Sequence, residues 1–154
     1  MTREELQTFL LHQIPLARCM ALEVDLLQPD RIRLSAPLSA NHNDKGTGFG
    51  GSIASLMTLA GWGLLHPHLQ RNRTEAELVI HQCQLHYQTP ATGRLHAETG
   101  VTNPTLETFL TTLQQRRKAR IGLEIHLHSD NRLCARMQAR FVALLKATSP
   151  CTPS

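Results

Sequence analysis

The stretch GGSIASLMTLAGWGLL, from Gly50 to Leu65, decides the fold of this chain. It is apolar on almost every helical face, and such a helix must be surrounded by the rest of its protein. At about 1.5 Å per residue the helix is roughly 24 Å long, which is enough to run through a small domain. We therefore predict a buried central helix that begins at Gly50 and that Pro67 ends.

The segments on either side of this helix alternate between apolar and polar residues. Such alternation is typical of strands with one buried face. Six segments show it: Met20–Leu27, Arg31–Ala36, Leu78–Tyr87, Arg94–Val101, Arg120–His128 and Leu133–Leu145. Because only one helix is apolar enough to cover six apolar strand faces, we expect an antiparallel sheet that curls around it, in the α+β class.

Two amphipathic helices complete the expected single domain of residues 1–146. The first spans Thr2–Gln13, where Thr2 and Glu5 have the spacing of a capping box and Pro15 stops the helix. The second spans Thr105–Arg116. The tail, residues 147–154, is rich in Thr, Ser and Pro, and we expect it to be disordered.

The strand Leu78–Tyr87 carries an assembly prediction. Its alternation puts Val79, Cys83, Leu85 and Tyr87 on the core side, and His81 shares their parity. The strand is long and has no Pro or Lys that would discourage pairing with another chain. It should therefore not remain a bare sheet edge.

Composition excludes several classes of function. The net charge of +4 is too diffuse to indicate a nucleic-acid partner. Gly46–Gln70 is uncharged, but its Gly, Ser, Thr, His and Pro residues make it a poor bilayer span.

The cysteines and the first residues bear on location. None of the four cysteines lies in a Cys-x-x-Cys pair, and Met1–Leu11 carries charges unlike a secretory leader, so we expect reduced thiols in a cytoplasmic protein. His126 and His128 share a strand face, but nothing completes a metal site, and we expect neither metal nor cofactor.

A family resemblance rests on four segments that together extend over nearly the whole chain. They are APLSANHNDKGTGFGGSIASLMTLAGWGLL (Ala36–Leu65), IPLARCM (Ile14–Met20), HYQTP (His86–Pro90) and RFVALL (Arg140–Leu145). In these segments the chain resembles the hot-dog thioesterases, and it is most similar to the YiiD C-terminal-domain family. The resemblance implies a hot-dog fold and hydrolysis of an acyl thioester of coenzyme A or acyl carrier protein. It also implies a homodimer or higher homo-oligomer with active sites between subunits.

The superfamily pattern, Asn-x-x-Gly-x-x-His-Gly-Gly with an acidic residue further along the helix, matches only in part. Asn43, Gly46 and Gly50-Gly51 agree with it. Phe49 stands at the histidine position, and by spacing Thr58 falls at the acidic position. Threonine can orient a water molecule but cannot be a general base at neutral pH, so these departures argue against the usual carboxylate-driven hydrolysis.

The start of the central helix is the candidate catalytic site. A helix N-terminus presents unpaired N–H groups and the positive end of the helix dipole. We predict that the N–H of Gly51 stabilises the oxyanion, that Asn43 positions water or the carbonyl, and that Thr58 assists. Structural readings stand beside these roles: the two glycines also suit a tight turn, and Asn43 also suits an ordinary loop cap.

The expected substrate-binding residues surround this helix start: Gly46, Thr47, Phe49, Gly50 and Ser55. Gly51, Ser55, Thr58 and Trp62 share one helical face, the only mildly polar stripe of the helix. For Ser55 the alternative is that a small residue permits close packing.

Two other functions stay open at this stage. A hot-dog dehydratase or hydratase needs a histidine paired with a carboxylate, and the loop offers only His42 with Asp44. A non-catalytic acyl-binding module would explain the missing acid. The basic run Arg116–Lys118, with Arg120, could meet a coenzyme phosphate or an acidic carrier protein, or could simply complement the dipole of the preceding helix.

Overall fold

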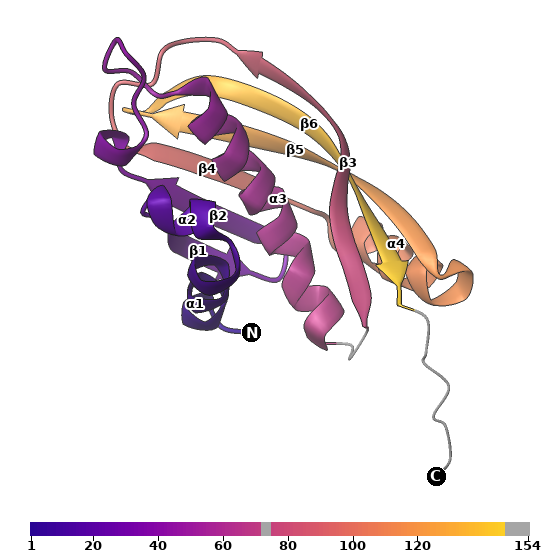
Figure 1. The fold of residues 1–154 in the computed structure, drawn as a ribbon. Coiled ribbons are helices and arrows are strands. Elements are labelled where there is room, and N and C mark those ends of the chain that lie inside the picture. Colours follow the sequence, from indigo (N-terminus) through magenta and orange to yellow (C-terminus); the bar gives the residue numbers. More distant parts are fainter. Residues whose placement is uncertain (72–74, 147–154) are drawn as a thin grey trace.

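The computed structural model describes residues 1–71 and 75–146, which form a curved antiparallel sheet with a long helix across its hollow side (Figure 1). The helices are α1 (Arg3–Gln13), α2 (Pro15–Cys19), α3 (Gly50–Arg71) and α4 (Asn103–Arg116), with a 3₁₀ turn at Leu38–Ala40. The strands are β1 (Glu23–Gln28), β2 (Arg31–Ala36), β3 (Ala76–Tyr87), β4 (Leu95–Gly100), β5 (Lys118–Ser129) and β6 (Arg132–Leu145). They form one six-stranded sheet in the order β1-β2-β4-β5-β6-β3. This is the α+β hot-dog fold that the sequence predicts; the expected disordered tail lies outside the described residues.

The helix α3 is the centre of the core, as predicted. Its buried side chains pack with those of the sheet and of α4 in one hydrophobic cluster. The buried apolar residues of α3 are Ile53, Leu56, Met57, Leu59, Ala60, Leu64, Leu65 and Leu69. The inward positions predicted for β5 and β6 are also buried, for example Ile125 and Phe141.

The predicted end of the central helix was wrong, because α3 continues through Pro67 to Arg71. An internal proline removes one backbone hydrogen bond of the helix. Contacts beyond Pro67 hold the last turn in place: Leu69 is buried, and Nε2 of His68 lies 2.7 Å from the carbonyl oxygen of Pro29. Tertiary contacts therefore carry the helix past the residue that was expected to stop it.

The region after α1 also differs from the prediction. The capping box between Thr2 and Glu5 is present, and α1 ends at Gln13. Pro15, however, is the first residue of the short helix α2, which ends at Cys19, directly before the segment in which a strand from Met20 was expected. The strand begins only at Glu23, since the chain first turns at Ala21, where φ is +52°.

A bulge in β3 changes which residues face the core. Ile80 pairs with Phe141 and Gln82 with Arg140, so His81 is the extra residue in the ladder. The predicted inward position of Val79 was therefore wrong: this side chain is 48% exposed, and Leu78 and Ile80 pack on the core instead. His81 is likewise exposed.

Beyond the bulge the predicted parity of β3 holds. Cys83 pairs with Ala139, Leu85 with Met137 and Tyr87 with Ala135, and these three partners on β6 are all buried. This half of β3 therefore directs Cys83, Leu85 and Tyr87 to the side of the sheet that carries α3.

The outer face of the sheet carries charged, solvent-accessible side chains. Nη2 of Arg94 lies 2.8 Å from a carboxylate oxygen of Glu23, and Arg33 and Glu98 are joined at 3.0 Å. Cys19, Cys83 and Cys134 are free thiols. Within residues 1–71 and 75–146, no helix is long and apolar enough to cross a membrane, and no group of three or more His, Cys, Asp or Glu side chains is placed to hold a metal ion.

Candidate functional site

The loop before α3 is shaped by Asn43. Its Oδ1 accepts hydrogen bonds from the backbone N–H groups of Lys45 (2.9 Å) and Thr47 (3.1 Å), and its Nδ2 donates to Oγ1 of Thr47 (3.0 Å). Gly46 lies between them with φ at +75°, a conformation that glycine adopts without strain. Asn43, Gly46 and Thr47, predicted separately, are thus brought together. The Asn43 carboxamide serves its own loop, and one of its two amide hydrogens is used there.

A second asparagine, which the sequence reasoning missed, fastens this loop to the body of the protein. Asn41 is 2% exposed, and its Nδ2 donates to the carbonyl oxygens of Met20 (2.9 Å) and Pro37 (2.8 Å). The backbone carbonyl oxygen of Asn41 accepts a hydrogen bond from the N–H of Phe49 at 2.8 Å. Asn41 therefore fixes the point from which the chain enters α3.

The start of α3 is open and uncharged. The N–H of Ile53 donates to the carbonyl oxygen of Phe49 at 3.0 Å, so the N–H groups of residues 50–52 precede this bond and lie in the unpaired first turn. The first turn contains no acidic residue. The positive end of the helix dipole thus has no nearby carboxylate from this turn to neutralise it.

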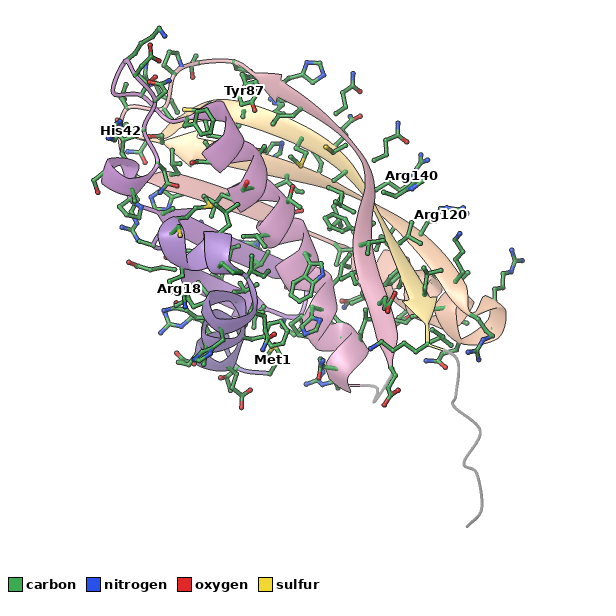
Figure 2. All side chains as sticks on the ribbon, viewed as in Figure 1. Met1, Arg18, His42, Tyr87, Arg120 and Arg140 are labelled. Carbon is green, nitrogen blue, oxygen red and sulfur yellow. The ribbon has the colours of Figure 1, made fainter. Side chains whose placement is uncertain are left out.

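Two aromatic side chains flank the glycine pair. The ring of Phe49, which is 53% exposed, lies so close to Gly51 that a Cβ there would collide with Cε1 of the ring. From β3, the hydroxyl of Tyr87 donates to the carbonyl oxygen of Gly50 at 2.8 Å (Figure 2). Burial of the phenol, with a smaller contribution from Cys83, raises the pKa of Tyr87, so the hydroxyl keeps its proton at neutral pH.

Tyr87 was not among the predicted site residues. The only sequence signal for it was its place in the HYQTP segment, because the bond to Gly50 joins residues 37 positions apart. At the other end of the same helix face, Nε1 of Trp62 donates to the carbonyl oxygen of Leu78 at 3.1 Å. The two bonds place α3 and β3 side by side and in opposite directions.

Ser55 and Thr58 lie on α3 between these two bonds. Oγ of Ser55 donates to the carbonyl oxygen of Gly51 at 2.8 Å, so this hydroxyl is bonded within its own helix. Thr58 is partly buried and, at about 1.5 Å per residue, lies roughly 12 Å along the helix from Gly50. The structure therefore does not bring Thr58 next to the glycine pair of its own chain.

The histidine and carboxylate of the loop do not form a catalytic pair. Both oxygens of Asp44 lie 3.0 Å from the Lys45 ammonium, and Nδ1 of His42 lies 2.9 Å from the carbonyl oxygen of Asn43. Both side chains are exposed. This geometry does not favour the dehydratase reading.

Comparisons with known proteins agree with the fold. Residues 3–145 match the family described as "Putative thioesterase (yiiD_Cterm)". A thioesterase structure from Shewanella oneidensis, titled putative, is 29% identical, with a TM-score of 0.83 over 92% of this chain and 96% of that one. A protein of unknown function from Chlorobaculum tepidum is 26% identical, with a TM-score of 0.88 over 94% of each chain. A probable thioesterase from Pseudomonas aeruginosa, 20% identical with a TM-score of 0.83 over 95% of this chain and 97% of that one, shares the fold.

Proposed function

The chain belongs to the YiiD_C family of putative thioesterases, and on that premise we propose that it hydrolyses acyl thioesters of coenzyme A or acyl carrier protein. The observation that carries this proposal is the start of α3. There, two glycines begin a core helix whose first turn is free of acidic residues and lies between two exposed aromatic rings.

The N–H of Gly51 is the proposed oxyanion donor. A thioester oxygen that approaches this N–H gains a hydrogen bond, and the bond strengthens as negative charge develops in the transition state. Glycine admits the oxygen because it has no side chain in the way. Phe49 must swing aside for this approach, which its exposure allows, and together with Tyr87 it supplies an apolar wall for the acyl group.

Asn43, Thr47 and Gly46 form the other wall of the proposed site. The second amide hydrogen of Asn43 is the group we assign to the substrate carbonyl or to the attacking water. Gly50 contributes the turn itself, and Ser55 a small polar surface beside it. Thr58 stands at the position of the usual acid but lies far from Gly51 of its own chain. We therefore propose that its hydroxyl orients the attacking water in the site of a neighbouring subunit.

That assignment requires a dimer, which we propose forms through β3. This strand ends the sheet, so one of its edges has no partner within the described chain, and it is 12 residues long. An unpaired edge of this length favours association with a second copy. The free thiols Cys19, Cys83 and Cys134 suit a cytoplasmic location, where cysteines stay reduced.

Acyl binding without hydrolysis is the second candidate. One observation favours it: the acid position holds Thr58, and Asp44, the only carboxylate of the loop, is bound to Lys45. Turnover of a panel of acyl-CoA and acyl-carrier thioesters, followed by release of free thiol, separates the two. Thiol release above the uncatalysed rate supports hydrolysis. Saturable binding of the acyl-CoA panel without thiol release from any substrate supports the binding module.

A further inference from the structure

The cations of this protein are distributed unevenly between two parts of the molecule. On the outer face near β1, β2 and β4, Arg33 and Arg94 each bind a carboxylate. Six further cationic side chains cluster where α4 ends, β5 begins and β6 ends. We call this cluster the basic end, and it consists of Arg116, Arg117, Lys118, Arg120, Arg140 and Lys146. No ion pair within the described residues involves any of them.

These six residues form a surface because the topology gathers them. Arg116 and Arg117 end α4, Lys118 begins β5, and Lys146 follows β6. Arg120 and Arg140 stand on neighbouring strands, where Arg120 pairs with Val142 and Gly122 with Arg140, and both point to the outer side of the sheet (Figure 2). The nearest carboxylates in the chain and the sheet are Glu75, Glu77, Glu107 and Glu124, of which Glu124 lines one hollow together with Arg140. Six cations near four carboxylates leave positive charge in excess.

We propose that the basic end docks an acidic acyl carrier protein that delivers the thioester, an inference that rests on the proposed function and on the β3 dimer. Charged groups of opposite sign steer such encounters and set their orientation. The six cations are exposed and spread over three elements, which suits the broad surface of a protein partner.

A nucleotide fits this surface less well than a carrier protein. Small-ligand sites are concave and mostly apolar. The hollow beside the basic end, between α4 and β5, has a volume of about 390 Å³ and includes one cation, Arg120, for the several phosphates of coenzyme A. The exposed aromatic rings that could stack on a base, Phe49 and Tyr87, lie at the start of α3 instead.

In the proposed β3 dimer, the basic end of one subunit would lie near the site of the other. Within one chain, Tyr87 pairs with Ala135 and Lys118 with Leu144, nine residues further along β6, which is roughly 30 Å. In an antiparallel pairing centred on β3, three strand spacings of about 4.8 Å separate Tyr87 from Lys118 of the partner subunit, roughly 14 Å. The pantetheine arm, equivalent in length to about five extended residues, reaches roughly 17 Å, which covers the second distance only.

The test neutralises part of the basic end in the full chain. Lys118→Gln/Arg120→Gln should raise the KM for an acyl carrier protein thioester about tenfold at low salt, and less at high salt. Hydrolysis of the N-acetylcysteamine thioester and of the CoA thioester with the same acyl group should stay within twofold. The control Arg18→Gln/Arg31→Gln removes the same charge from α2 and the start of β2, far from β3 in the sheet order, and should leave the KM of all three substrates unchanged.

Binding of apo acyl carrier protein to the same variants, measured by calorimetry, tests docking without any turnover. Binding that weakens in the Lys118→Gln/Arg120→Gln variant alone supports the proposal. Equal binding by all variants overturns it, as does a larger rise in KM for the CoA thioester than for the carrier thioester. Failure of the proposed function looks different: the unmodified protein would then hydrolyse none of the three thioesters, while the binding measurement still decides the docking.

Mixed dimers test whether the basic end serves the other subunit. One chain carries Gly51→Val and an intact basic end, and the other carries Lys118→Gln/Arg120→Gln and an intact site. Recovery of the low KM for the carrier thioester in the mixed dimer supports action across the interface. A KM that stays raised overturns it.

Discussion

The first turn of α3 and its second half belong to one continuous helix, yet the side chains on their outer faces have opposite surroundings. At its start, Gly51 is exposed beside the open rings of Phe49 and Tyr87. Further along, Trp62 and His66 stack with their ring centroids 4.1 Å apart, and Phe9 of α1 stacks on His66 at 4.9 Å. The first turn is left uncovered, whereas α1 packs against the second half.

This contrast separates function from stability along a single helix. The backbone groups at the start can serve a substrate because few core contacts depend on them. The aromatic stack in the second half excludes water and secures α3 against α1 and β3. Substitutions in the first turn should therefore change turnover with little effect on folding, and those in the second half should do the reverse.

The largest effect is expected at the start of the helix. Gly51→Val places a branched side chain against Phe49 and in the path of a substrate oxygen. Loss of one oxyanion donor typically lowers kcat by about 10²–10³, and we expect at least this loss. The melting temperature should change little because Gly51 is exposed. Gly122→Val, at an exposed glycine of β5 with open space around it, is the matched control and should keep turnover of small thioesters. Full kcat/KM in Gly51→Val would place the reaction elsewhere.

The second-largest effect is expected in the second half of α3, which α1 covers. Trp62→Ala removes the stack with His66 and the hydrogen bond to the carbonyl oxygen of Leu78. Because Trp62 is only partly buried, we expect a loss of about 2–3 kcal/mol in the free energy of unfolding, measured by urea denaturation. The KM of the best substrate should stay within about threefold. A variant that unfolds normally but loses turnover would show that the active surface extends along the whole helix.

Between these two extremes lies Thr58. Thr58→Val keeps the shape of the side chain and removes the hydroxyl, so an orienting role predicts a fall in kcat of about tenfold with unchanged folding. Ser55→Ala removes the other hydroxyl of the same face, which bonds to the carbonyl oxygen of Gly51 and contributes only polar surface to the site, so it should lower kcat less than Thr58→Val does. Equal activity in both variants would leave Thr58 a packing residue only.

The sequence was sufficient to predict the sheet and its central helix because alternation and continuous apolarity follow directly from burial. It was insufficient where a tertiary contact overrides local preference. Buried Leu69 and bonded His68 carry α3 past Pro67, and the bulge at His81 exposes Val79. The bulge arises from how β3 pairs with β6, so the alternation of residues within β3 alone does not predict it.

The site could be predicted only where it is contiguous in the chain. The loop and helix start from Asn43 to Gly51 follow from one motif, and these residues are indeed neighbours. Asn41 and Tyr87 escaped prediction because their roles depend on partners 21 and 37 residues away. A hydrogen bond between residues far apart in the chain produces no periodic pattern that the sequence could reveal.

The smallest effect concerns pH and again belongs to the covered half of α3. Burial lowers the pKa of His66 below its ordinary value near 6.5, and its Nε2 is buried with no hydrogen-bond partner within the described residues. As pH falls through about 6.5, the unfolded chain binds a proton at this ring more readily than the folded chain does. The protein should therefore lose stability from pH 7.5 to pH 5.5. His66→Phe keeps a ring for Trp62 and Phe9 to stack on and removes the titrating group, so its melting temperature should fall less over the same interval. Part of the fall should persist, because burial also lowers the pKa of His68.

An equal fall in melting temperature for the two proteins between pH 7.5 and pH 5.5 would show that His66 takes no part in the acid sensitivity. A reduced slope with unchanged thioester turnover at pH 7.5 would confirm that this half of the helix contributes to stability alone.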